Sequence, residues 1–262
     1  MRKRYPTDLK EEEWEIIEPL LPPVLPGGRP RKHEMSEILN GIFYISRSGC
    51  AWRMLPNDFP PWNTVYYYFN RWTQDGTWQV INDELRMKVR IQVGKHPEPS
   101  AGIIDSQSVK TTDVGGVDGY DAGKKVTGRK RHILVDTLGL VLAAVVHSAA
   151  IQDRDGAKLV FKKAADFLPR LKLVWADAGY AGQLIGWVFE MCHWLLEIVK
   201  RPSETRFVLV KKRWIVERTF GWIGKYRRLS KDYEHFTDSS ESMIYIAMIQ
   251  LMLHRLARHN TS

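Results

Sequence analysis

The stretch SAGIIDSQSVK, residues 100–110, joins a short apolar run to an acid and a string of polar residues. Gly102, Ile103 and Ile104 predict a buried strand, because a short apolar run bounded by polar residues is typical of strands inside a sheet. A carboxylate at the end of such a strand is costly to bury unless a positive group meets it. Asp105 therefore either begins a turn or points into a site that holds a cation.

The residues that follow predict an α/β region. Besides the strand over residues 102–109, the patterns indicate a long Gly- and Lys-rich loop over 111–130 and helices on the faces of a sheet. The expected strands are 102–109, a hairpin over 131–148, 171–176 and 194–199; the expected helices begin near 153, 182, 211 and 239 and end near 167, 191, 229 and 258. This order predicts a mixed five-stranded sheet flanked by helices.

The residues before this region read as helical. A first helix is expected between a cap at Thr7 or Asp8 and the prolines at 22–23, and three more are expected near 34–48, 61–74 and 77–92. The helix near 61–74 has a core stripe of Val65, Phe69 and Trp72. We place an all-helical domain at 1–93, a Pro-containing linker at 94–100 and the α/β domain at 101–262. Helix, turn and helix with a polar, aromatic outer face is compatible with a helix-turn-helix-like element that contacts DNA, although most small helical bundles with such a face bind nothing.

Composition narrows the class of protein. The chain has 262 residues and a formal charge of +9, with 39 Lys and Arg against 30 Asp and Glu. That excess favours a polyanionic partner, nucleic acid before an anionic membrane surface. Two cysteines, Cys50 and Cys192, make no disulfide framework or zinc motif, which fits a reducing cytosol. The start lacks the apolar core of a signal peptide, and the longest apolar run is too short to span a bilayer, so we expect a cytoplasmic protein without a membrane partner.

Three acids need an explanation. Asp105 lies in the first predicted strand, and Asp177 follows the apolar run 171–176, where the strand ends of an α/β sheet form a crevice. Glu217 lies on a predicted helix with Arg213, Gly221, Gly224 and Arg228 on the same stripe. A plain Arg213–Glu217 ion pair explains part of that stripe. The two glycines indicate a close approach, either by DNA or by another helix.

If the three acids meet, electrostatics decides what they do. Like charges about 4 Å apart repel by about 4 kcal/mol at an effective dielectric of 20, so the acids would raise one another's pKa or bind a hard cation. Oxygen-only ligands favour Mg²⁺ or Mn²⁺ over zinc. Two such ions about 4 Å apart suit an in-line displacement at phosphorus.

Several stretches together resemble a known family. The chain is similar to bacterial insertion-sequence DDE transposases of the insertion-sequence-five family, which have an RNase H-like catalytic domain. The resemblance covers nearly the whole chain and is carried by EEEWEIIEPLLPP, GGRPRKH, GCAWRMLPNDFPPWNTVYYYFNRW, IIDSQSVK, GYDAGKKVTGRKRHILVDTLGLVLAAVVHSAAIQDRDGA, WADAGYAG and RWIVERTFGWIGKYRRLSKDYE.

The resemblance implies that Asp105, Asp177 and Glu217 are the catalytic residues and the ligands of two Mg²⁺ ions, with Mn²⁺ as a substitute. It implies cleavage and strand transfer of double-stranded DNA, namely terminal inverted repeats and target DNA, by a homodimer or higher oligomer near the bacterial nucleoid. The family's Tyr-x2-Arg-x3-Glu-x6-Lys motif is only partly present, because Val210 holds the Tyr position and the Lys comes one residue late, at Lys225.

Basic and polar residues on the expected outer surfaces are the candidate DNA contacts, since phosphate neutralisation dominates DNA affinity. They are Arg31, Lys32, Asn63, Tyr67, Asn70, Arg71, Lys124, Lys125, Arg129, Lys130, Arg131, Arg213, Lys225 and Arg228.

Other polar residues have simpler interpretations. Asp153 and Asp155 are interpreted as helix N-caps, with a metal-binding or site-shaping role as the alternative. His132 and His147 are interpreted as core or surface histidines rather than ligands.

Two other functions remain open from the sequence. An RNase H-like nuclease would cut DNA without joining it, and a non-enzymatic DNA-binding regulator derived from a transposase would do neither. The intact set of three acids argues against the regulator.

Overall fold

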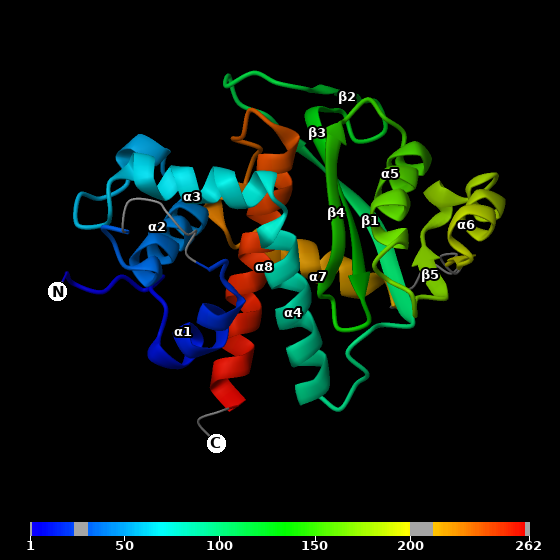
Figure 1. Ribbon diagram of the computed structural model, residues 1–262. Coiled ribbons are helices and arrows are strands. Elements are labelled where there is room, and N and C mark those ends of the chain that lie inside the picture. The colour runs from blue at the N-terminus through cyan, green and yellow to red at the C-terminus, as the bar shows by residue number, and fades with distance from the viewer. Residues whose placement is uncertain (1, 24–30, 200–211, 260–262) are drawn as a thin grey trace.

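The computed structural model describes residues 2–23, 31–199 and 212–259. Six strands form one sheet, and eight α-helices lie in the described part of the chain (Figure 1). The strands are β1 (Ala101–Lys110), β2 (Gly119–Asp121), β3 (Val126–Asp136), β4 (Val141–Ser148), β5 (Leu173–Ala176) and β6 (Leu195–Ile198). The α-helices are α1 (Glu11–Ile17), α2 (Met35–Ser48), α3 (Trp62–Gln74), α4 (Thr77–Gln92), α5 (Asp153–Ala165), α6 (Leu184–Cys192), α7 (Arg213–Ile223) and α8 (Thr237–His259).

The sheet has the order β2-β3-β1-β5-β6, and β4 pairs with β3. β1 is antiparallel to β3 and parallel to β5, and β5 is parallel to β6. The five long strands therefore lie in the order β4-β3-β1-β5-β6, with three antiparallel strands beside two parallel ones. This mixed α/β arrangement, with helices on both faces, confirms the expected RNase H-like fold.

The apolar run in β1 is explained by helices on both faces of the sheet. Ile103 packs with α4, α7 and α8 in one core cluster, and Ile104 packs with α5 and α6 in another. Neighbouring side chains of a strand point to opposite faces, so both isoleucines are buried. By the same alternation Asp105 lies on the face covered by α7, and Ser106 lies on the face covered by α5.

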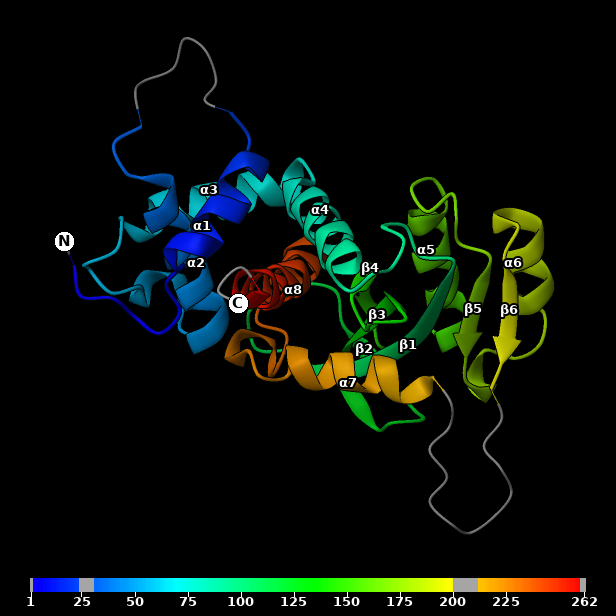
Figure 2. The same cartoon turned by 90° about the horizontal axis from the view of Figure 1, so that it is seen from below.

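The N-terminal helices do not stand apart from the rest of the molecule. α8 packs against α1, α2, α3 and α4 on one side and against β4 on the other (Figures 1 and 2). Asn82 in α4 donates from its side-chain amide to the carbonyl of Val141 in β4 over 2.9 Å. The chain from Gly94 to Ser100 forms turns without a helix or strand. The division into domains at 1–93 and 101–262 stays a prediction.

Two expectations about elements were wrong in detail. The predicted loop 111–130 contains β2 and the start of β3, because Gly119, Tyr120 and Asp121 pair with residues 126–128. The helix expected to end near 229 stops at Ile223, where Gly224 follows and the chain turns into a short 3-10 helix, Arg227–Leu229. Residues 24–30 and 200–211, the second of which includes Val210, lie outside the described residues.

The fold buries the predicted helical stripe of the third helix. Val65, Phe69 and Trp72 of α3 are all buried, whereas Tyr67 on the same helix is 56% exposed. An apolar stripe on one side of α3 therefore faces α2 and α4, and the opposite side is left to solvent.

Candidate active site

Asp105 sits near the middle of β1, on the face that α7 covers. Its carboxylate accepts a hydrogen bond from the backbone N–H of Ser106 at 2.7 Å. Burial, with a smaller contribution from the nearby Asp177, raises the pKa of Asp105 to about 6, while the Ser106 N–H, Arg213 and Lys124 act in the opposite direction. Asp105 is thus an acid held in a poorly solvated place beside a second acid, which is an environment that favours a bound cation.

Asp177 is brought to Asp105 by strand pairing. β1 and β5 run parallel, with Gly102 opposite Val174 and Ile103 opposite Trp175. Continued by two residues, this register sets Asp105 opposite Asp177. Asp177 comes directly after β5 and begins a short 3-10 turn, Ala178–Tyr180, whose Gly179 N–H donates to Asp177 Oδ1 at 2.8 Å.

That hydrogen bond orients the second carboxylate. With Oδ1 held by the turn, Oδ2 is the oxygen that faces Arg213, at 3.6 Å from its guanidinium Nη2. A Cβ at position 179 would lie 3.0 Å from Asp177 Oδ1, so glycine there lets the carboxylate fold closely over the turn.

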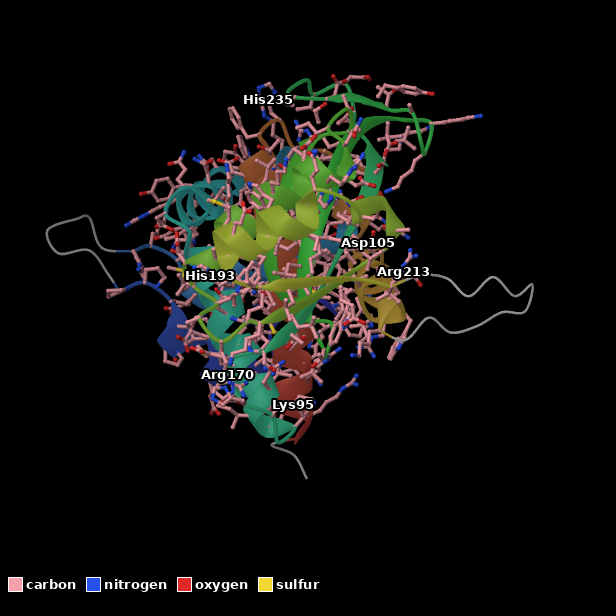
Figure 3. The ribbon with its side chains drawn as sticks, turned by 90° about the vertical axis from the view of Figure 1, so that its right-hand side faces the viewer. Lys95, Asp105, Arg170, His193, Arg213 and His235 are labelled. Carbon is pink, nitrogen blue, oxygen red and sulfur yellow. The ribbon has the colours of Figure 1, made fainter. Side chains whose placement is uncertain are left out.

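Glu217 reaches the same edge from α7. The helix crosses one face of the sheet and contacts β1 and β3 (Figure 2). Ile215, Val216 and Ile223 anchor α7 in the core, which leaves Glu217 on the outer side with its side chain 56% exposed. Arg213 Nη2 lies 3.5 Å from Glu217 Oε1, so one guanidinium bridges Asp177 and Glu217. Asp105 and Arg213 are labelled in Figure 3 at this edge.

The donor set fits a hard divalent cation by its chemistry. Asp105, Asp177 and Glu217 offer carboxylate oxygens alone, the ligand type that Mg²⁺ prefers. As the side chains stand, residues 2–23, 31–199 and 212–259 contain no group of three or more acidic, His or Cys residues close enough to hold an ion. Arg213 supplies the positive charge between two of the acids, so an ion that used all three ligands would require the guanidinium to move.

Gly221 separates the two explanations of the glycines in α7. Apart from the residues next to it and the backbone of its own helix, no described atom lies within 4 Å of a Cβ placed at Gly221, one turn after Glu217. No neighbouring helix therefore makes the close approach that a glycine at this position would allow. The open space beside Glu217 remains accessible to a ligand from outside.

Several predicted DNA contacts lie on the surface. Arg31, Lys32, Asn63, Tyr67, Lys124, Lys125 and Lys225 are exposed, and Asn70 and Arg71 are half-buried on α3. Lys124 lies closest to the acids among the predicted loop cations, since its Nζ donates to the Ser106 carbonyl at 3.0 Å and contributes to the field at Asp105. Arg213 is the predicted contact that lies within the site itself.

Other predicted DNA contacts are buried, and for these the structure gives a different role. Arg129 has no exposed surface and donates to the carbonyls of Val117, Glu234 and His235, while Arg131 donates to those of Leu229 and Lys231. Both arginines therefore tie β3 to the segment before α8.

Lys130 and Arg228 are also enclosed. Lys130 pairs with Asp153 at 2.9 Å and Asp121 at 3.4 Å, and Arg228 pairs with Glu234 at 2.7 Å. We correct the expectation for Arg129, Lys130, Arg131 and Arg228, because phosphate cannot reach groups that are already buried and paired. A basic run in a sequence does not distinguish strand residues that alternate between faces from an exposed loop.

Asp153 and Asp155 are not helix caps. Gln152 holds the N-cap position of α5 and makes no side-chain cap. Asp153 instead accepts from Ser106 Oγ at 3.0 Å, directly behind Asp105, and Asp155 pairs with Lys158 on the surface. The alternative of a site-shaping role for Asp153 therefore agrees with its contacts better than capping does.

Comparison with known proteins identifies the family of the chain. Residues 96–252 match the family described as "Transposase DDE domain", and residues 9–82 match "Putative transposase of IS4/5 family (DUF4096)". The class of protein is thus a transposase, and because the first match spans more than half of the chain, the chain belongs to the DDE transposases of the IS4/IS5 family.

Two relatives come from Burkholderia cepacia. The chain is 28% identical over 142 residues to the "Putative transposase for insertion sequence element IS402", covering 52% of this chain and 67% of that protein. It is also 28% identical over 115 residues to the "Insertion element IS402 uncharacterized 16.2 kDa protein", covering 41% of this chain and 76% of that protein. Transposase domains of this class generally use divalent metal ions. Within the described ranges, no helix has the length and apolarity needed to cross a membrane.

Proposed function

We propose that this transposase binds the terminal inverted repeats of its insertion sequence, cleaves DNA there and joins the freed end to target DNA. The observation that carries the proposal is the approach of Asp105, Asp177 and Glu217 at one edge of the sheet, with Asp105 and Asp177 on neighbouring parallel strands and Arg213 between Asp177 and Glu217. Acids that lie at one edge of a sheet, beside an open helix face, are expected where a phosphodiester is to be attacked.

In this proposal the three acids hold two Mg²⁺ ions, for which Mn²⁺ can substitute. Bound there, the ions would supply a nucleophile at neutral pH and neutralise charge on the phosphorus oxygens. The protein's own part is to orient. The Gly179 N–H fixes Asp177, the buried strand fixes Asp105, and α7 supplies Glu217 from an anchored helix. Positioning and charge stabilisation account for most of the rate in phosphoryl transfer.

Arg213 has two roles in the proposal. Without DNA it neutralises Asp177 and Glu217, each of which lies within 3.6 Å of its guanidinium. With DNA, the guanidinium turns from the carboxylates to a phosphate, a ligand that matches its planar set of donors.

The proposed DNA surface consists of residues that are exposed or half-buried. Asn63, Tyr67, Asn70 and Arg71 lie along the solvent side of α3, which suits a helix that reads a groove, and Arg31 and Lys32 lie before α2. Lys124, Lys125 and Lys225 add positive charge near the acids. We propose further that two copies pair the two ends of the element as a homodimer or larger homo-oligomer, at the nucleoid in the cytoplasm.

The test is cleavage of the element's own terminal repeat with Mg²⁺, comparing the wild type with Glu217→Gln and Asp105→Asn. Both variants are expected to lose cleavage by at least a hundredfold while they still bind the repeat. Asp155→Asn is the matched control, because Asp155 is an exposed acid that pairs only with Lys158 among the described contacts. Its cleavage rate should equal that of the wild type.

Two results would contradict parts of the proposal. If paired ends and target DNA yield only hydrolysis products, the protein is a nuclease that does not join strands. If the wild type and both acid variants bind the repeat without cleaving it, the protein is a DNA-binding regulator.

A further inference from the structure

Behind the acids, a buried chain of hydrogen bonds runs through three aromatic side chains. The hydroxyl of Tyr180 lies 2.9 Å from His132 Nε2, and His132 Nδ1 lies 2.8 Å from His147 Nε2. His147 Nδ1 in turn lies 2.8 Å from the carbonyl oxygen of Ser148. Tyr180 and His132 are at most 1% exposed, and His147 is 6% exposed.

The carbonyl at the end of this chain fixes every proton in it. A carbonyl only accepts, so His147 Nδ1 carries a hydrogen and its Nε2 in the neutral ring is an acceptor. His132 must then donate from Nδ1, which leaves its Nε2 as an acceptor. The Tyr180 hydroxyl therefore donates to His132. Burial lowers the pKa of His132 to about 3 and also lowers that of His147, which keeps both rings neutral.

The hydrogen-bonded histidines are enclosed by α5 as well as by the sheet. A Cβ at Gly156 would lie 2.4 Å from His147 Nε2 and 2.6 Å from His132 Cε1. Only glycine lets the first turn of α5 pack directly on both rings. The two imidazoles therefore cannot turn to other partners without moving α5.

Tyr180 connects the hydrogen-bonded histidines to the turn that holds Asp177. It is the last residue of the turn Ala178–Tyr180, which Asp177 begins, and the Gly179 N–H in the same turn holds Asp177 Oδ1. Its partner His132 lies opposite Ser106 in the β1–β3 pairing, next to Asp105. The chain of hydrogen bonds thus links the turn behind Asp177 to β3 and β4, and β3 pairs directly with β1, the strand that carries Asp105.

We propose that Tyr180 is a positioning residue that, through His132 and His147, holds Asp177 in the place where it binds a divalent cation beside Asp105. This inference rests on the proposed function, since it assigns a support to the same metal site. Groups that orient metal ligands from behind commonly change metal affinity by ten- to a hundredfold when they are removed.

The first experiment measures Mn²⁺ binding to the full chain by electron paramagnetic resonance, comparing the wild type with Tyr180→Phe. The variant keeps the ring and removes only the hydroxyl. We expect its Mn²⁺ affinity to fall about tenfold or more, with the affinity for a terminal-repeat duplex in EDTA unchanged. Tyr245→Phe is the matched control, because it removes a buried hydroxyl that accepts from the Ala144 N–H. Its Mn²⁺ affinity should equal that of the wild type.

The second experiment measures the protonation of the two histidine rings directly and needs no substitution in the turn. Long-range ¹H–¹⁵N spectra of histidine-labelled protein should show both His132 and His147 as neutral rings with the proton on Nδ1. In His147→Leu, His132 Nδ1–H loses its acceptor, and we expect Mn²⁺ affinity to fall in the same direction as in Tyr180→Phe. His147→Gln keeps a carbonyl acceptor and should restore most of it.

The outcomes separate this inference from the proposed function. Wild-type Mn²⁺ affinity in folded Tyr180→Phe, or a proton on Nε2 of His132, overturns the positioning role. If Tyr180→Phe does not fold, the spectra and the pair of His147 variants decide. If Asp105→Asn binds Mn²⁺ as the wild type does, the metal site itself is refuted, whatever the Tyr180 variant shows.

Discussion

Arg213 and Asp177 meet across the open edge of the sheet, with guanidinium Nη2 3.6 Å from carboxylate Oδ2. The same guanidinium lies 3.5 Å from Glu217. A protein cation therefore occupies the position at which a divalent ion would bind two of its three ligands, and the competition between them can be measured.

Arg213→Gln is expected to tighten Mn²⁺ binding to the DNA-free protein by about threefold or more, because it removes the charge that competes for Asp177 and Glu217. It should also weaken the binding of a repeat duplex, since one phosphate contact is lost. Titration with Mn²⁺ and a DNA-binding assay over several salt concentrations measure both effects. Weaker Mn²⁺ binding in the variant would mean that Arg213 supports the ion rather than competing with it.

Asp105→Asn is expected to stabilise the metal-free protein at pH 7.5. Burial raises the pKa of Asp105 to about 6. Ionising this carboxyl above that pH therefore costs free energy in the folded state that it does not cost in the unfolded state. The gain in the free energy of unfolding should be on the order of 1 kcal/mol, reduced from the full shift by partial solvent exposure. It should vanish at pH 3.5, where the carboxyl is protonated in both states. Urea unfolding at the two pH values provides the measurement.

His132 predicts a second pH dependence with a defined sign. Its pKa is about 3 in the folded protein and near 6.5 when unfolded, so between these values the unfolded state binds one proton more. Stability therefore falls as the pH decreases from 6.5, by up to about 1.4 kcal/mol per pH unit for this group. His132→Gln should make unfolding less dependent on pH between 6.5 and 5 than in the wild type. An equally steep dependence in the variant would assign the loss to other groups.

Arg129 and Lys125 provide a contrast between two basic residues close in sequence. Arg129→Met removes the positive charge that pairs with the buried Asp232 and leaves several buried carbonyls without their donor, so we expect a loss of about 3–5 kcal/mol in the free energy of unfolding. Lys125→Ala lies on an exposed turn and should leave unfolding unchanged while weakening DNA binding and lowering its salt dependence by about one phosphate. Denaturant unfolding and salt-dependent DNA binding test the pair. Equal stability of the two variants would contradict the structural role of Arg129.

Gly221 tests whether the open face of α7 receives DNA. Gly221→Ala should raise the free energy of unfolding by up to about 1 kcal/mol, because the helix gains a better former and no atom blocks the new Cβ. Gly221→Leu should fold as well, yet cut the repeat at least tenfold more slowly if a DNA backbone passes close to Glu217. Thermal unfolding and the cleavage assay are the measurements. Unchanged cleavage by the leucine variant would show that nothing approaches closely there.

The sequence predicted those parts of the fold that depend on local pattern. Ile103 and Ile104 indicated a strand buried on both faces, and the spacing of Val65, Phe69 and Trp72 indicated the buried side of α3, which the structure confirms. The partners of Arg129 and Arg131 could not be predicted, because they are backbone carbonyls about a hundred residues away. Sequence spacing alone does not show which strand residues meet a distant segment.

In the site, too, local sequence pattern indicated some residues, whereas contacts between distant segments were missed. Asp105, Asp177 and Glu217 stood out as acids beside apolar runs, and their assignment as metal ligands stays a prediction. The chain through Tyr180, His132 and His147 was missed, because it is formed by tertiary pairing of β1, β3 and β4 with a turn. Its one trace in the sequence is Gly156, a glycine near the start of a helix, and a glycine by itself does not say what packs against it.

In the sequence, α8 comes after all six strands of the sheet. Its apolar side nevertheless completes the core formed by the N-terminal helices α1 to α4, which are synthesised first. During synthesis, α1 to α4 can pack on one another, but they lack the apolar side of α8 that completes the burial of this core until Thr237–His259 has left the ribosome. A chain interrupted before that point exposes part of this core and becomes a substrate for chaperones and proteases. Such fragments would not accumulate as folded competitors for the protein's sites on the chromosome.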